Sequence, residues 1–126
     1  MSFRIALSGL GAAKADLSVS ANNIANSNTN GFKSSRAEFA DIVASSGAAL
    51  ESTFGDGVRV ATVAQQFTDG NISFTGNPLD LAITGEGFFR LNNNGAINYS
   101  RAGAFNTDRE GFLVNSFGHR LTGFSA

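Results

Sequence analysis

Residues 3–24 read FRIALSGLGAAKADLSVSANNI, and the spacing of their apolar side chains decides the architecture of the first part of the chain. Large apolar residues recur in steps of seven, and one more falls between them at an offset of three or four, which is the period of one face of an α-helix. The members of this apolar seam are Phe3, Leu7, Leu10, Leu17 and Ile24. The pattern predicts one long amphipathic helix from Phe3 to Asn26, on the order of 35 Å in length.

This helix is poorly suited to stand alone in water. Gly9 and Gly11 each cost about 1 kcal/mol relative to alanine, and isolated helices are marginal even without glycine. Burial of each large seam side chain would contribute roughly 1.5–3 kcal/mol, which outweighs the glycine cost. We therefore expect the seam to be buried against a partner helix, and its small flanking residues would allow a close approach.

The face opposite the seam carries few charges. It offers Arg4, Lys14 and Asp16, and otherwise serine and asparagine. An alternative is that the helix folds back on the chain's own β region, but a helix covered on one side only normally shows a charged outer face. Because neutral amides can be buried when their hydrogen bonds are matched, this composition argues against the alternative and favours contacts with neighbouring molecules.

The sequence changes character after the helix. Asparagine-rich sequence meets Gly31, whose tolerance of left-handed backbone suits a helix end between residues 26 and 30. After Lys33 the composition shifts: Phe39, Ile42 and Val43 are spaced for two helical turns, and residues 44–57 are small, polar and glycine-bearing, which predicts a connector. We divide the chain into an N-terminal assembly helix at 1–30, a connector at 31–57 and a β-rich domain at 58–126.

From Val58 onward, apolar residues alternate with a period of two, which is typical of strands. Strands are predicted around residues 58–63, 72–74, 79–83 and 88–91. Asn94-Gly95, between two apolar runs, is a strong signal for a tight hairpin, since both residues accept positive φ. The expected fold class is α+β: a long N-terminal α-helix, an extended connector and then a small antiparallel β domain.

Composition excludes several classes of function. The 126 residues hold 9 Lys+Arg against 10 Asp+Glu and no cysteine, so there is no basic field for nucleic acid and no thiolate chemistry. His119 is the only histidine and fits a turn or strand edge better than a catalytic base. We predict no enzyme, no catalytic or metal-binding residues and no cofactor.

A membrane partner is not expected either. The chain has no apolar run of the roughly 18 residues that span a bilayer, and no apolar core of a cleavable signal peptide. An amphipathic helix lying on a membrane surface is a second alternative, but it would need lysine and arginine on its polar face. Ser and Asn stand there instead, so this alternative fits badly.

The helix end and four later motifs resemble the bacterial flagellar rod and hook proteins. The N-terminal match is residues 22–33, NNIANSNTNGFK. The later motifs are 76–83 (GNPLDLAI), 85–89 (GEGFF), 99–105 (YSRAGAF) and 121–124 (LTGF), in the order of that family. Phe39-Ala40-Asp41 and Gly57-Val58-Arg59-Val60 are more similar to the hook members than to the rod members. The resemblance covers essentially the whole chain.

The resemblance implies a structural subunit of the flagellar hook, a curved tube that acts as a universal joint and transmits motor torque to the filament; a distal or proximal rod subunit is the alternative. Implied partners are other hook subunits in a homopolymer, the C-terminal helix of the full-length subunit, and the rod, hook cap and hook–filament junction proteins. The β-rich domain would be the first part of the outer hook domain. Implied localisation is the extracellular flagellum at the basal body, reached without cleavage of a signal peptide.

We expect the signature residues to form contacts between subunits. They are Asn22, Asn23, Asn26, Thr29, Gly31, Phe32 and Lys33. The alternative is that the three asparagines only cap a fraying helix end. Family members continue beyond this point into a second helix, so the chain corresponds to the N-terminal part of such a protein. In a monomer, we expect a folded β region and a flexible N-terminal helix.

Overall fold

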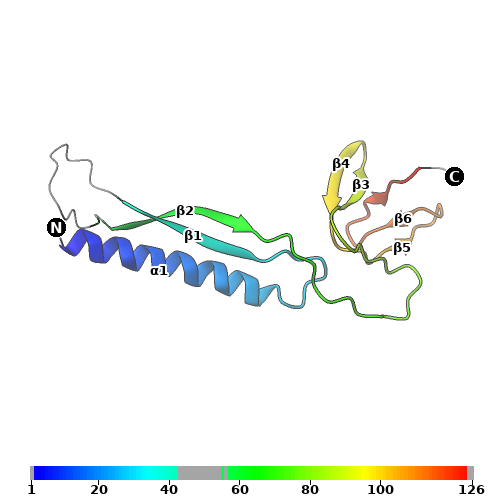
Figure 1. Ribbon diagram of the computed structural model, residues 1–126. Helices are drawn as coiled ribbons and strands as arrows, with labels where there is room; N and C mark the ends of the chain where they lie inside the picture. Colours follow the sequence, from blue (N-terminus) through cyan, green and yellow to red (C-terminus); the bar gives the residue numbers. More distant parts are fainter. Residues whose placement is uncertain (1, 43–54, 56, 125–126) are drawn as a thin grey trace. The chain divides into compact units, whose positions relative to one another are not determined.

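The computed structural model describes residues 2–42, 55 and 57–124, and it confirms the α+β fold class (Figure 1). Two compact units share the chain. The helix unit contains residues Met1–Ser27 and Lys33–Gln66, and the β unit contains Asn28–Phe32 and Phe67–Ala126. The expected boundaries at residues 30 and 57 differ from those of the two units. The loop Asn28–Phe32 belongs to the β unit, and the strand that begins at Val58 belongs to the helix unit.

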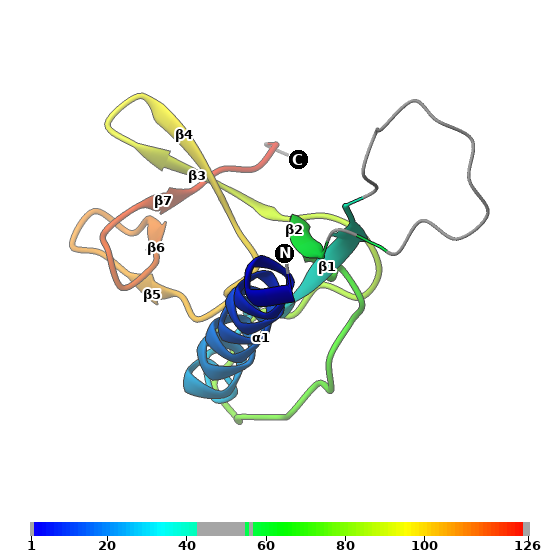
Figure 2. The same ribbon diagram turned by 90° about the vertical axis from the view of Figure 1, so that its left-hand side faces the viewer.

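The helix unit consists of one helix lying along a two-stranded antiparallel sheet. Helix α1 spans Ser2–Ala25, close to the predicted range. Strands β1 (Ser35–Asp41) and β2 (Val58–Gln65) pair antiparallel, with Ser35 opposite Gln65 and Asp41 opposite Val58. Figure 2, viewed close to the helix axis, shows this hairpin on one side of α1.

The hairpin corrects two expectations from the sequence. Phe39 was expected in a helical turn and lies in β1, where the register shifts between Glu38 and Phe39. The run from Val58 to Gln65 was expected in the β domain and instead pairs with Ser35–Asp41. The physical reason is shared: an extended segment satisfies its backbone hydrogen bonds only with a second strand, and local apolar spacing does not reveal which one. Val43 lies outside the described residues.

The β unit is built on a five-stranded antiparallel sheet with the order β4-β3-β7-β6-β5. Its strands are β3 (Phe89–Asn93), β4 (Ala96–Ser100), β5 (Asn106–Thr107), β6 (Leu113–Val114) and β7 (Arg120–Leu121). The predicted hairpin at Asn94-Gly95 is confirmed, with φ of 50° and 98° at the two turn residues. This positive-φ turn matches the twist of the paired strands.

Two side chains form the fully buried core of the described residues, and both belong to the β unit. Leu91 on β3 and Phe105 are each 1% exposed. The Phe105 ring meets the ring of Phe89 edge to face, with centroids 5.2 Å apart, a geometry that adds to the gain from burial. Leu91 pairs with Leu121 on β7, so this core joins the sheet to the segment that precedes β5.

The predicted strands at residues 72–74 and 79–83 are wrong. Ile72 and Phe74 are exposed and lie in irregular chain, and the second segment contributes only an isolated bridge between Asp80 and Ala104. Both runs are short and are flanked by Gly70, Gly76, Pro78, Gly85 and Gly87. Apolar alternation alone cannot overcome residues that remove hydrogen-bond donors or favour turns.

Candidate assembly surface

Helix α1 has two faces that differ in the size of their side chains. The half-buried face consists of Ser8, Ala12, Ala15, Val19 and Asn23, which recur at offsets of three and four. It packs against β1 and β2. All but one of these side chains are small or polar, so the helix can approach the hairpin closely.

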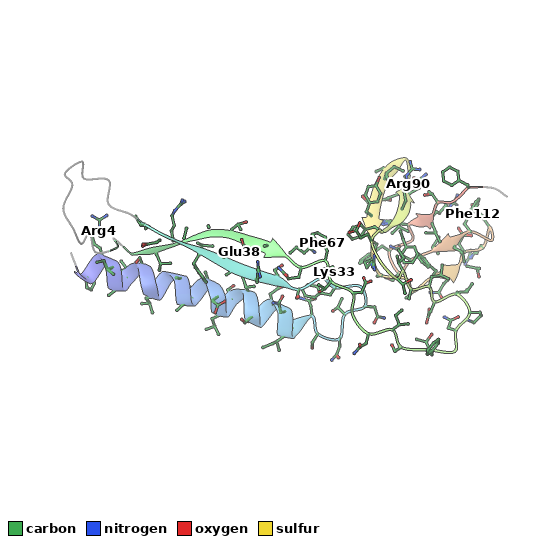
Figure 3. The ribbon with its side chains drawn as sticks, in the orientation of Figure 1. Arg4, Lys33, Glu38, Phe67, Arg90 and Phe112 are labelled. Atoms are coloured by element: carbon green, nitrogen blue, oxygen red, sulfur yellow. The ribbon has the colours of Figure 1, made fainter. Side chains whose placement is uncertain are left out.

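The opposite face is the apolar seam predicted from the sequence. Its five members, Phe3, Leu7, Leu10, Leu17 and Ile24, are 57–77% exposed. Figure 3 shows side chains projecting from the side of α1 that is turned away from the hairpin. The seam is therefore a continuous stripe of large apolar side chains along one helix, in contact with solvent in the single chain.

This arrangement corrects the interpretation of the helix's surroundings. The helix does pack against the chain's own β structure, which the sparse charge of its polar face had argued against. The error was to assign the contacts of the neutral face to neighbouring molecules rather than to strands of the same chain. Small residues bury less apolar area than leucine, but they permit a close approach at which the helix and the strands exchange hydrogen bonds.

One such contact joins the N-terminal half of α1 to the start of β2. The hydroxyl of Ser8 donates to the Ile5 carbonyl at 2.7 Å and accepts from the Val58 N–H at 3.2 Å. Gly57 precedes Val58 with φ of 113°, and a Cβ atom there would collide with the Ser8 hydroxyl. The approach therefore requires both a small polar residue on the helix and glycine before the strand.

A second contact joins the C-terminal half of α1 to the start of β1. The Asn23 side-chain amide donates from Nδ2 to the Ser35 carbonyl at 2.6 Å, and its Oδ1 accepts from the Ser35 N–H at 2.9 Å. Both halves of the amide are thus paired with one residue of the same chain. Asn23 had been expected at a contact between subunits; its spacing from Ser8, Ala12 and Val19 was the signal for the inner face.

The other signature residues are divided between the units. Asn22 and Asn26 lie at the end of α1, where the Asn26 Nδ2 donates to the Asn22 carbonyl at 3.0 Å, and half-buried Lys33 also belongs to the helix unit. Thr29, Gly31 and Phe32 belong to the β unit. There the Phe32 N–H donates to the Thr29 carbonyl at 3.2 Å.

Gly31 lies against the backbone of a distant part of the β unit. Its φ is 74°, as expected from the sequence, and an ideal Cβ would lie 2.5 Å from the Ala102 nitrogen and 2.6 Å from the Arg101 carbonyl carbon. Only glycine permits this approach. Two motifs that the sequence offered separately, at residues 22–33 and 99–105, therefore meet in space.

Chemistry of other kinds finds little support among the described residues. His119 lies in the turn before β7, as predicted; its N–H donates to Asn115 Oδ1 at 2.9 Å. Within residues 2–42, 55 and 57–124, no group of three or more His, Asp or Glu side chains could hold a metal ion. In the same part of the chain, α1 lacks the apolar character needed to cross a bilayer.

Comparison with known proteins identifies two family models. Residues 3–33 match the model described as "Flagella basal body rod protein", and residues 82–124 match the "Flagellar hook protein FlgE/F/G D1 domain". The first match covers most of α1 and the signature loop. The second covers the whole five-stranded sheet.

Curated relatives agree with both models. The chain is 51% identical to the flagellar hook protein FlgE of Salmonella typhimurium and 50% identical to that of Escherichia coli, in each case over 100% of this chain and 30% of the relative. It is 40% identical to the flagellar basal-body rod protein FlgG of Agrobacterium fabrum, over 93% of this chain and 50% of the relative. The chain thus spans between 30% and 50% of the length of these relatives.

Proposed function

We propose, from the premise that this chain belongs to the family of flagellar hook and rod proteins, that it is the N-terminal part of a hook subunit. Such subunits would polymerise into a curved tube that transmits motor torque to the filament. The observation that carries this proposal is the solvent-exposed seam of α1, combined with identity of about half to hook proteins over the full chain.

The seam supplies a physical reason to polymerise. Each of its large side chains would contribute roughly 1.5–3 kcal/mol if removed from water. Because the opposite face of α1 is already occupied by the hairpin, the seam is the apolar face of the helix that is left open to a further helix. We assign this place to the C-terminal helix of the full-length subunit and to the same helices of neighbouring subunits.

The rod is the second candidate within the family. The rod relative is less similar than the hook relatives, at 40% against 51% identity, although the chain spans a larger share of it. Higher identity over the whole chain favours the hook. The rod, hook cap and hook–filament junction proteins would then be neighbours of the subunit at the ends of the polymer.

The proposed location follows from the proposed role. A hook subunit would act outside the cell, at the basal body of the flagellum, and would reach that place through the flagellar exporter without cleavage of a signal peptide. Asn22 and Lys33 remain proposed contacts between subunits. Asn23 is a weaker candidate, since its amide already pairs with Ser35.

The test uses the full-length subunit in cells that lack their own copy. Leu10→Asn together with Leu17→Asn should abolish tube assembly, because two buried amides would lack partners. Asp16→Asn, an exposed position away from the seam on the same helix, is the control and should leave assembly intact. Electron micrographs of the unsubstituted protein separate the two candidates, since a curved tube supports the hook and a straight one the rod. Normal tubes from the double variant would refute the role of the seam.

A further inference from the structure

The chain passes between its two units three times. It leaves the helix unit after Ser27, returns at Lys33 and leaves again after Gln66. The two ends of the intervening segment lie together, because the Gln66 N–H donates to the Ser34 carbonyl at 2.7 Å. The β1–β2 segment is therefore a side branch that starts and finishes at nearby points.

The first of these passages is fixed by the loop Asn28–Phe32. This loop docks on the backbone of Arg101 and Ala102 so closely that any side chain at Gly31 would collide with it. The backbone of Arg101 and Ala102 cannot move aside at low cost, so the close fit between the two backbone segments holds the loop in place.

The last passage is fixed by the side chain of Arg101. After Gln66, the chain runs through an irregular segment to β3. The Arg101 side chain is 9% exposed. Its Nη1 donates to the Gly87 carbonyl at 2.5 Å. Its Nη2 donates to Asp69 Oδ1 and the Gly85 carbonyl, both at 2.7 Å, and to the Ile83 carbonyl at 2.9 Å.

Further contacts strengthen this attachment. The second oxygen of the Asp69 carboxylate accepts from the Gly85 N–H at 2.7 Å, and the Leu81 N–H donates to the Gly103 carbonyl at 2.8 Å. A planar guanidinium can serve several acceptors in this fixed geometry, and an ammonium cannot. Three consecutive residues, Arg101, Ala102 and Gly103, therefore hold both parts of the chain that arrive from the helix unit. We call them the anchor.

We propose that the anchor carries mechanical load from α1 directly into the β unit and so bypasses the β1–β2 hairpin. Load applied to α1 reaches the docked loop before it reaches Lys33. While the loop stays docked, load carried along the backbone of α1 leaves at the loop and does not run through the backbone of the hairpin. Once the loop undocks, the hairpin is pulled from its open end, where ladder hydrogen bonds break one after another. The load path is a property of this chain, and its use in torque transmission rests on the proposed function.

A single-molecule pulling experiment on the purified chain tests this proposal. The chain has no cysteine, so two introduced thiols define the points of attachment. Ser18→Cys with Ser116→Cys applies load across the units, and Asn93→Cys with Ser116→Cys applies it within the β unit. Unravelling of α1 between residue 18 and the loop is common to all variants pulled across the units.

Gly31→Ala should undock the loop. Pulled across the units, this variant should show a new early step of roughly 110 Å, the extended length of Lys33–Gln66 at about 3.3–3.6 Å per residue. The unsubstituted chain should lack this step until the β unit yields. The matched control is Gly118→Ala, which has a nearly equal φ of 79° but where an added Cβ would meet no atom within 4 Å beyond the adjacent residues. An early step in the unsubstituted chain, or an equal one in the control, would overturn the proposal.

Arg101→Lys tests the second attachment and covers the case in which Gly31→Ala does not fold. Amide exchange of Leu81 and Gly85 should accelerate at least roughly tenfold, as expected when charge-assisted hydrogen bonds are lost. Pulled across the units, this variant should release the segment between Gln66 and β3 at lower force. Arg120→Lys, whose guanidinium lies near Glu110 and Asp108, should leave both readouts unchanged. Unchanged exchange in Arg101→Lys would contradict the anchor.

Discussion

The two units of this chain are stabilised in different ways. The β unit contains both of the fully buried large side chains among the described residues, Leu91 and Phe105, whereas the helix unit is held by small side chains and by hydrogen bonds from Ser8 and Asn23 to strand backbone. The large apolar residues of the helix point to solvent. Under the proposed function, the helix unit keeps its strongest apolar surface for assembly, while the β unit uses part of its own to fold.

The largest expected effect comes from removing the core of the β unit. Phe105→Ala should cost about 3–5 kcal/mol, because it removes a fully buried ring and its contact with Phe89. Hydrogen exchange should show lost protection in β3 and β7 and retained protection in β1 and β2. Phe117→Ala, at an exposed ring, is the control and should change little. Equal loss in both units would mean that they do not fold separately.

The helix unit should respond most strongly at Asn23. Asn23→Leu keeps the approximate volume but leaves the Ser35 N–H and carbonyl without their partner, at a cost of about 1–3 kcal/mol. Urea unfolding followed by exchange of the β1 amides measures the loss. Asn22→Leu, on the exposed side of the same turn, is the matched control. If the two variants behave alike, the amide pairing with Ser35 does not stabilise the unit.

A smaller effect is expected at Ser8. Ser8→Ala removes the acceptor of the Val58 N–H and should cost about 0.5–1.5 kcal/mol, partly offset by the higher helix propensity of alanine. Ser18→Ala, at an exposed position on the same helix, gains the same helix propensity but does not remove the hydrogen bond to the Val58 N–H. The difference between the two variants in urea isolates the hydrogen bond. A difference of zero would remove Ser8 from the interactions that hold α1 to β2.

The sequence predicted elements well and their partners less well. The long helix, the seam and the Asn94-Gly95 hairpin were predictable because period and turn chemistry are local. The pairing of Val58–Gln65 with Ser35–Asp41 was not predictable, because the composition of a strand does not indicate which other strand it pairs with. The division of small from large residues on α1 was visible, but its meaning depended on a hairpin that the sequence did not reveal.

The contacts of Arg101 and Gly31 could not have been derived from spacing. Both residues stood in motifs that supported the family resemblance, yet nothing in either motif indicated that the two would meet. Loop docking depends on a close approach of two backbone segments that are far apart in the sequence. The only sign of such an approach in the sequence itself is a glycine. The role of the signature residues between subunits, and the flexibility of α1 in a monomer, stay predictions.

The smallest effect on the isolated chain, and the one that separates the two faces of α1, is expected at Leu17. Leu17→Asn should change the free energy of unfolding by less than about 0.5 kcal/mol, because an exposed side chain loses little when it becomes polar. Val19→Asn, two residues along and half-buried toward the hairpin, should destabilise the helix unit. In full-length subunits, Leu17→Asn should lower the polymer yield although it leaves the stability of the monomer unchanged. Loss of monomer stability in Leu17→Asn would mean that the seam already serves the fold, and the case for keeping it for assembly would fail.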